Sequence, residues 1–183
     1  MAQRSHAYAS GRVRVLSAGL LNQAAIERVA ASPTLADAAR ALTELGWGEV
    51  RTKRDMEDAA RKHMAEACAL VREISPEPDV TNSFLIRYDA LNLKMLVKAR
   101  SLKMPLENLP LSGYGALDAE RLRRAVDENK YADLPAELKE AMERIEKKIA
   151  GAMDPLYVDA ELDKAAALYA ENHTRGVKNE TVR

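Results

Sequence analysis

Hydrophobic residues recur along this chain at steps of three and four, the spacing that places side chains on one face of an α-helix. The breaks between these stretches fall at proline and glycine clusters, where helices end. No segment alternates apolar and polar residues as a half-buried strand does. The pattern therefore predicts an all-α protein, with helices over residues 11–31, 34–45, 55–74, 80–104, 118–130, 134–153 and 156–173.

The helix predicted over 80–104 combines two kinds of position. Its apolar positions are expected to face inward: Phe84, Tyr88, Leu91, Met95 and Leu102. Asp89 and Asn92 interrupt this pattern, although both are poor helix formers that prefer caps and turns. Because buried polar groups are nearly always hydrogen-bonded, we expect both side chains to bind groups of a neighbouring helix.

Two helical stretches before and after residues 105–116 resemble each other in outline. Residues 28–42 and 124–138 each read as a helix end, a turn and a second helix. We therefore expect a first helical repeat at 1–115 and an incomplete second one at 116–183, with the glycine- and proline-containing loop as the boundary. The second copy lacks a counterpart of the helix at 80–104. Its last helix is thus expected to keep an exposed apolar patch (Leu156, Val158, Leu162, Tyr169), so that the C-terminal half self-associates or is mobile.

Composition narrows the function without defining it. The chain has 183 residues with 28 Lys+Arg and 28 Asp+Glu, a balance that does not indicate a nucleic-acid-binding protein. No apolar run approaches the roughly 20 residues of a membrane span, and the first residues lack the apolar core of a signal peptide. Cys68 is the only cysteine, so no internal disulfide can form. These features predict a soluble protein without a transmembrane segment that stays in the compartment where it is made.

Residues for catalysis or metal binding are sparse. His6, His63 and His173 stand far apart, and no phosphate-binding loop, zinc spacing or nucleophile motif occurs. We therefore expect no catalytic residues, no cofactor and no metal.

Basic residues follow one edge of the helix at 80–104: Arg87, Lys94, Lys98 and Arg100. Cations near a helix C-terminus stabilise it and keep it soluble, which is one interpretation. The other is a docking edge for an acidic partner.

Three segments resemble one known family. Residues 8–21 (YASGRVRVLSAGLL), 84–100 (FLIRYDALNLKMLVKAR) and 111–116 (LSGYGA) are similar to the C subunit of V-type and archaeal A-type rotary ATPases, which is named the d subunit in eukaryotes. The most specific elements lie in the second segment, where Tyr88, Asp89, Asn92 and Lys94 match the family's signature.

The resemblance implies a non-catalytic, all-helical protein built from three related repeats around a pseudo-threefold axis. Such a protein forms a funnel-shaped socket on the cytoplasmic face of the membrane. It joins the central stalk to the proteolipid rotor ring and so couples ATP chemistry to proton or sodium transport. This chain is about half the length expected of three repeats. The alternative from another class is a free-standing helical adaptor that binds an acidic protein.

Overall fold

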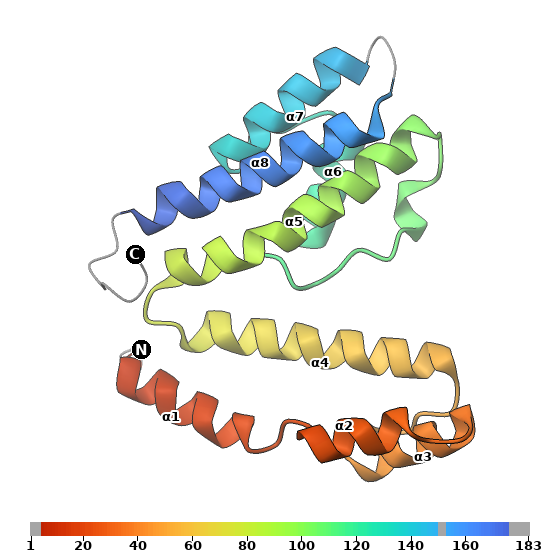
Figure 1. The fold of residues 1–183 in the computed structure, drawn as a ribbon. Coiled ribbons are helices and arrows are strands. Elements are labelled where there is room, and N and C mark those ends of the chain that lie inside the picture. Colours follow the sequence, from red (N-terminus) through yellow and green to blue (C-terminus); the bar gives the residue numbers. More distant parts are fainter. Residues whose placement is uncertain (1–4, 150–152, 176–183) are drawn as a thin grey trace. The chain divides into compact units, whose positions relative to one another are not determined.

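The computed structural model describes residues 5–149 and 153–175, and helices account for all the regular structure in these ranges (Figure 1). The chain divides into two compact units, Met1–Pro76 and Glu77–Arg183. The all-α prediction is confirmed. The boundary between the compact units lies between residues 76 and 77 rather than in the loop at 105–116. The helix with the signature residues therefore belongs to the same unit as the C-terminal helices. The division into repeats concerns similarity rather than packing and stays a prediction.

The N-terminal unit contains four helices: α1 (His6–Ser17), α2 (Gln23–Ala30), α3 (Leu35–Glu44) and α4 (Lys53–Ile74). The single helix predicted over 11–31 is wrong, because the chain leaves the helix after Ser17 and starts a new one at Gln23. The Asn22 side chain caps that second start by accepting a hydrogen bond from the Ala25 amide at 2.8 Å. Such a side-chain cap stabilises a helix end that would otherwise leave its amides unpaired.

A small core joins α3 to the segment before α4. Ala39, Leu42 and Val50 are buried, and Trp47 packs against them. Gly46 and Gly48 adopt φ values of +86° and +84°, a region that side chains with a Cβ rarely enter. These two glycines therefore allow the tight turn that brings Trp47 onto the core. The start of α4 is fixed by a capping box between Thr52 and Asp55.

The C-terminal unit is built around α5 (Pro78–Ser101), which lies alongside α8 (Pro155–Thr174) in Figure 1. A short 3₁₀ helix η1 (Leu106–Asn108), α6 (Ala119–Asp127) and α7 (Ala136–Ile149) complete the unit. α5 packs against α8 and α6, and α7 packs against α8. Together the helices enclose one extensive hydrophobic core, whose fully buried members include Leu93, Leu96, Leu138, Met142 and Leu162.

The inward face predicted for α5 is wrong. Phe84, Leu91 and Leu102 are 65%, 52% and 71% exposed, whereas Ile86, Leu93, Leu96 and Val97 fill the core. The helix carries apolar residues on two sides, and the side with Ile86, Leu93, Leu96 and Val97 is the one that the other helices of the unit cover.

The prediction of an exposed apolar patch on the last helix is also wrong for three of its four residues. Val158, Leu162 and Tyr169 are buried, and only Leu156 is exposed. The reason is that α5 itself covers α8, as the missing closing helix was expected to do. The apolar face that motivated the prediction of self-association through α8 is therefore buried within this unit.

Candidate functional site

The signature residues lie at the contact between α5 and the loop that connects η1 to α6. Asp89 and Asn92 project from α5 one turn apart and are 0% and 2% exposed. The hydrogen bonds described for them are with backbone groups of residues 112–117, in the loop before α6. We call Asp89, Asn92 and this loop segment the α5–loop clamp.

Asp89 binds two consecutive amides. Its Oδ2 accepts hydrogen bonds from the backbone N–H of Ala116 at 2.7 Å and of Leu117 at 3.2 Å. A buried carboxylate is costly unless its oxygens are satisfied, and hydrogen bonds to a charged acceptor are among the stronger ones. The pairing therefore explains why an aspartate occupies the middle of this helix.

Asn92 binds both backbone groups of a single residue. Its Nδ2 donates to the Ser112 carbonyl oxygen at 2.9 Å, and its Oδ1 accepts from the Ser112 N–H at 2.9 Å. The amide side chain thus pairs with both backbone groups of Ser112, as the backbone of a neighbouring β-strand does in a sheet. Only a side chain with both a donor and an acceptor can do this, which accounts for asparagine at this position.

Gly115 lies directly against the Asp89 carboxylate. A Cβ built at this position would overlap Asp89 Oδ1 and Cγ, whereas a Cβ built on Gly113 would meet no atom within 4 Å. The missing side chain of Gly115 is therefore what lets the loop approach the clamp. The sequence contained this signal in the segment LSGYGA, but spacing alone does not reveal the close contact.

Tyr88 and Arg87 lie at the outer side of the same contact. The Tyr88 ring meets the Tyr114 ring edge to face, with centroids 5.4 Å apart. The Arg87 guanidinium stacks 4.9 Å above the Tyr88 ring centroid, a cation–π arrangement. Arg87 is exposed on the surface of α5.

Lys94 and Lys98 form ion pairs with α8 that the sequence did not predict. Lys94 Nζ lies 2.6 Å from Asp163 Oδ1, and Lys98 Nζ lies 2.5 Å from Asp159 Oδ1. We call these two pairs the α5–α8 ion-pair seam. Because their carboxylates come from the same chain, both cations are already engaged within the C-terminal unit.

Arg100 enters a polar network at the end of α5. Its guanidinium donates to the Val126 carbonyl oxygen at 2.6 Å and pairs with the Glu146 carboxylate. The Tyr131 hydroxyl also donates to Glu146, at 2.6 Å. Burial and then the hydrogen bond to Glu146 raise the pKa of Tyr131 well above its ordinary value of 10.0. The network links α5 to α7 and to the connection between α6 and α7, so its role is structural.

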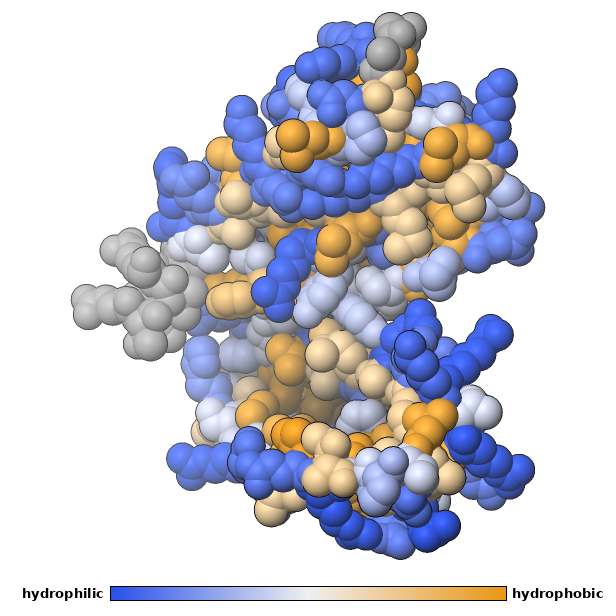
Figure 2. All heavy atoms as spheres, turned by 45° about the vertical axis from the view of Figure 1, so that its right-hand side comes forward, coloured by the Kyte–Doolittle hydropathy of each residue, from blue (hydrophilic) through white to orange (hydrophobic). Residues whose placement is uncertain are grey.

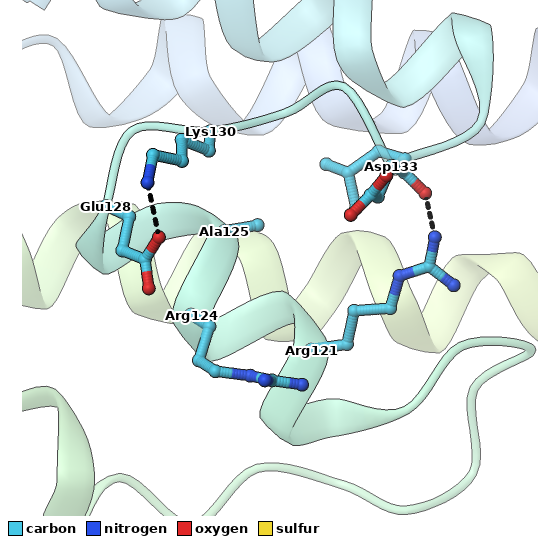
Figure 3. A pocket seen from close by; sticks show the side chains of 7 residues that line it. Arg121, Arg124, Ala125, Glu128, Lys130 and Asp133 are labelled. Atoms are coloured by element: carbon cyan, nitrogen blue, oxygen red, sulfur yellow. Dashed lines mark hydrogen bonds and ion pairs between the residues drawn. The ribbon is translucent and has the colours of Figure 1, made fainter.

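A surface hollow lies where α6 meets the start of the connection to α7 (Figure 3). Arg121 donates to the Asp133 carbonyl oxygen, and Lys130 Nζ lies 3.0 Å from Glu128 Oε2. Charges of both signs line the hollow, and their side chains are exposed to water. The arrangement resembles a solvated polar surface and offers no nucleophile next to a base.

An apolar groove of about 480 Å³ lies within the N-terminal unit, between α1, the α3–α4 turn and α4. Hydrophobic residues line the hollow in the lower part of Figure 2, the part in which Figure 1 shows these helices. Trp47 and His63 meet there, with ring centroids 5.1 Å apart, and Glu66 lies 3.5 Å from His63 Nδ1.

Neither hollow contains a metal site. Within residues 5–149 and 153–175, no three His, Cys, Asp or Glu side chains come together in a way that could hold a metal ion. None of the helices described in these ranges has the length and apolar character needed to cross a membrane.

Comparison with known proteins indicates the same family as the signature residues on α5. The family model of the ATP synthase (C/AC39) subunit matches residues 9–182. No match is found among curated proteins, and none among solved structures.

Proposed function

Because the chain belongs to the family of the ATP synthase (C/AC39) subunit of V-type and A-type rotary ATPases, we propose that it joins the central stalk to the membrane rotor ring of such a machine. In this role it is a peripheral, non-catalytic component on the cytoplasmic face of the membrane. It transmits torque between ATP chemistry on the stalk side and proton or sodium transport in the proteolipid ring.

The observation that carries the proposal is the family match over almost the whole chain, together with the position of the signature residues. Asp89 and Asn92 are fully engaged in holding a loop, and Lys94 in holding α8. Residues used in this way fit a protein whose task is mechanical, since torque can pass only through elements that keep their mutual positions.

The C-terminal unit has features that resist deformation. α5 is held by a hydrophobic core on one side, by the α5–loop clamp, and by the α5–α8 ion-pair seam. Close-packed interiors of this kind have low compressibility and transmit strain. These contacts support a coupling element rather than a hinge.

Three of the four cations on the basic edge of α5 give the adaptor alternative no support. Lys94, Lys98 and Arg100 pair with Asp163, Asp159 and Glu146 of the same chain. An acidic partner would have to displace these carboxylates before it could bind the three cations.

Reconstitution tests the proposal. The full chain is added to purified central-stalk proteins and to detergent-solubilised proteolipid ring, and then to rotary ATPase membranes stripped of their own C/AC39 component. We expect the chain to bind both the stalk and the ring and to restore ATP-driven ion transport. Failure to bind either component, with transport unrestored by a helical and folded chain, would contradict the proposal.

A further inference from the structure

The side of α5 that faces away from the core carries a second hydrophobic stripe. We call Phe84, Tyr88, Leu91 and Met95, together with Leu102 at the C-cap, the outer face of α5. Their spacing of four, three, four and seven residues follows the a and d positions of a heptad repeat, the seam of a coiled coil, with Lys98 at the d position between Met95 and Leu102. Single exposed apolar residues are normal, but an aligned stripe over several turns of a helix is typical of a surface that binds a partner.

The residue types of the outer face also match those of binding surfaces. Protein interfaces are enriched in aromatic residues, methionine and arginine. Phe84, Tyr88 and Met95 lie on the stripe and Arg87 lies beside it, with its guanidinium stacked on Tyr88. The stripe is straight and helical, so its natural complement is another helix that inserts side chains between these positions.

Charge along the stripe limits what that helix can be. Arg87, Lys94 and Lys98 follow one edge, and no carboxylate of α5 lies on the outer face. Lys94 and Lys98 have the carboxylates of Asp163 and Asp159, whereas the contacts described for Arg87 are with the Tyr88 ring and hydroxyl. A helix covering the stripe would remove water from Arg87, and a desolvated guanidinium needs a hydrogen-bonded anion.

A second copy of α5 does not supply this anion. The helix has only two carboxylates, Asp79 and Asp89. Asp89 is buried in the α5–loop clamp, and Asp79 lies in the first turn, on a different side of the helix from Leu91. Two outer faces packed on each other would therefore leave Arg87 of each copy without a partner.

We propose that the outer face of α5 binds a helix of another protein chain, one with apolar residues at heptad spacing and carboxylates along the edge that meets Arg87. The inference stands on the stripe and its charge alone. It does not depend on the proposed role in a rotary ATPase.

A pair of designed peptides tests the proposal on the full chain. Both are helical heptad peptides with Leu at a and d, and they differ only in having Glu or Lys at every e and g position. Each is labelled with a fluorophore, and binding is followed by fluorescence anisotropy. We expect the Glu peptide to bind at least about tenfold more tightly than the Lys peptide, because like charges next to Arg87 disfavour binding.

Variants of the chain locate the binding. Leu91→Glu places a charge in the centre of the stripe and is expected to weaken binding of the Glu peptide by about tenfold or more. Leu156→Glu is the matched control, since Leu156 is equally apolar and 76% exposed but lies on α8. Arg87→Glu should reverse the preference so that the Lys peptide binds more tightly. Circular dichroism and the melting temperature verify that each variant is folded.

Three results would overturn the proposal. The first is equal binding of the two peptides. The second is binding that is unaffected by Leu91→Glu. The third is a chain that binds neither peptide but dimerises in sedimentation experiments until Leu91→Glu is introduced, which would identify a second copy as the occupant.

Discussion

Asp89 occupies a position at which a carboxylate would be costly without its partners. It is fully buried in the middle of a helix, and two backbone amides of the loop at 116 and 117 satisfy its oxygens. The loop reaches these oxygens because Gly115 has no side chain. One aspartate and one glycine, 26 positions apart, therefore depend on each other.

Gly115→Ala tests this dependence. The added methyl group overlaps the Asp89 carboxylate, so the loop must move and weaken its hydrogen bonds. Overpacking of this kind costs about 1–3 kcal/mol of unfolding free energy. Gly113→Ala is the control, because open space surrounds that position, and its effect should stay within about 0.5 kcal/mol. Chemical denaturation followed by circular dichroism measures both. Equal effects of the two substitutions would mean that the close contact does not exist.

Tyr131 predicts how stability changes with pH. Burial, reinforced by the hydrogen bond to Glu146, raises the pKa of the Tyr131 hydroxyl above 10.0. In the unfolded chain the phenol loses its proton near pH 10.0, whereas in the folded chain it keeps the proton to higher pH. The unfolded state then binds fewer protons than the folded one, so stability falls as pH rises above that value.

Tyr131→Phe removes this contribution. The variant should be less stable at neutral pH by about 1 kcal/mol, because the hydrogen bond to Glu146 is lost. Its melting temperature should fall less steeply than that of the unmodified chain as pH increases from about 10. Parallel slopes for the two proteins would show that Tyr131 does not titrate differently in the folded state. Lysine deprotonation affects both proteins and cancels in the comparison.

Among the elements, α5 shows how far periodicity can predict a fold. Spacing predicts this helix over 80–104, and the observed helix is Pro78–Ser101. The start is predictable because the polar, proline-containing turn at 75–79 interrupts the preceding helix. Spacing does not predict which face is buried, since Phe84 and Leu91 alternate with Leu93 and Leu96 around a helix that is apolar on two sides. The choice depends on which stripe fits α8 and α6, and that fit is a tertiary property.

The ion-pair seam could not be predicted for the same reason. Lys94 and Lys98 are visible in the sequence as cations on one edge, but their partners lie 69 and 61 residues away on α8. Asp159 and Asp163 are spaced four apart and therefore share a helix face. Only the packing of α8 against α5 identifies that face as the one that meets the lysines.

Packing of α8 against α5 gives a prediction at this scale. Leu162→Ala should destabilise the C-terminal unit by about 2–5 kcal/mol, because Leu162 is fully buried and its truncation leaves a cavity. Leu156→Ala is the matched control on the same helix; Leu156 is exposed, so its effect should stay within about 0.5 kcal/mol. Urea unfolding of both variants measures the difference. A small effect of Leu162→Ala would mean that α5 does not cover α8.

In the molecule as a whole, family and fold class could be predicted from the sequence, whereas the compact units could not. The resemblance carried by residues 84–100 is confirmed by the family match over 9–182. Glycine and proline residues made the loop at 105–116 look like a boundary. The clamp residues Asp89 and Asn92 instead bind this loop to α5, so the loop lies inside the C-terminal unit.

Two fragments test whether the boundary between the folding units lies at residues 76 and 77 or in the loop at 105–116. Residues 77–183 contain the extensive core of the C-terminal unit, whose buried members run from Ile86 to Tyr169. We expect this fragment to be helical and to unfold in one cooperative transition. Residues 116–183, the second repeat as the sequence divides it, lack α5 and would expose Val158 and Leu162 to water. This shorter fragment should show no cooperative transition.

Thermal unfolding followed by circular dichroism compares the two fragments with the full chain. The transition of 77–183 should coincide with one transition of the full chain, since its core takes no buried residue from the N-terminal unit. If 116–183 alone unfolded cooperatively and 77–183 gained no stability over it, α5 would be dispensable for this unit. The boundary predicted at the loop would then describe the folding units better than the division at residues 76 and 77. We expect the opposite, because α8 buries most of its apolar face only when α5 is present.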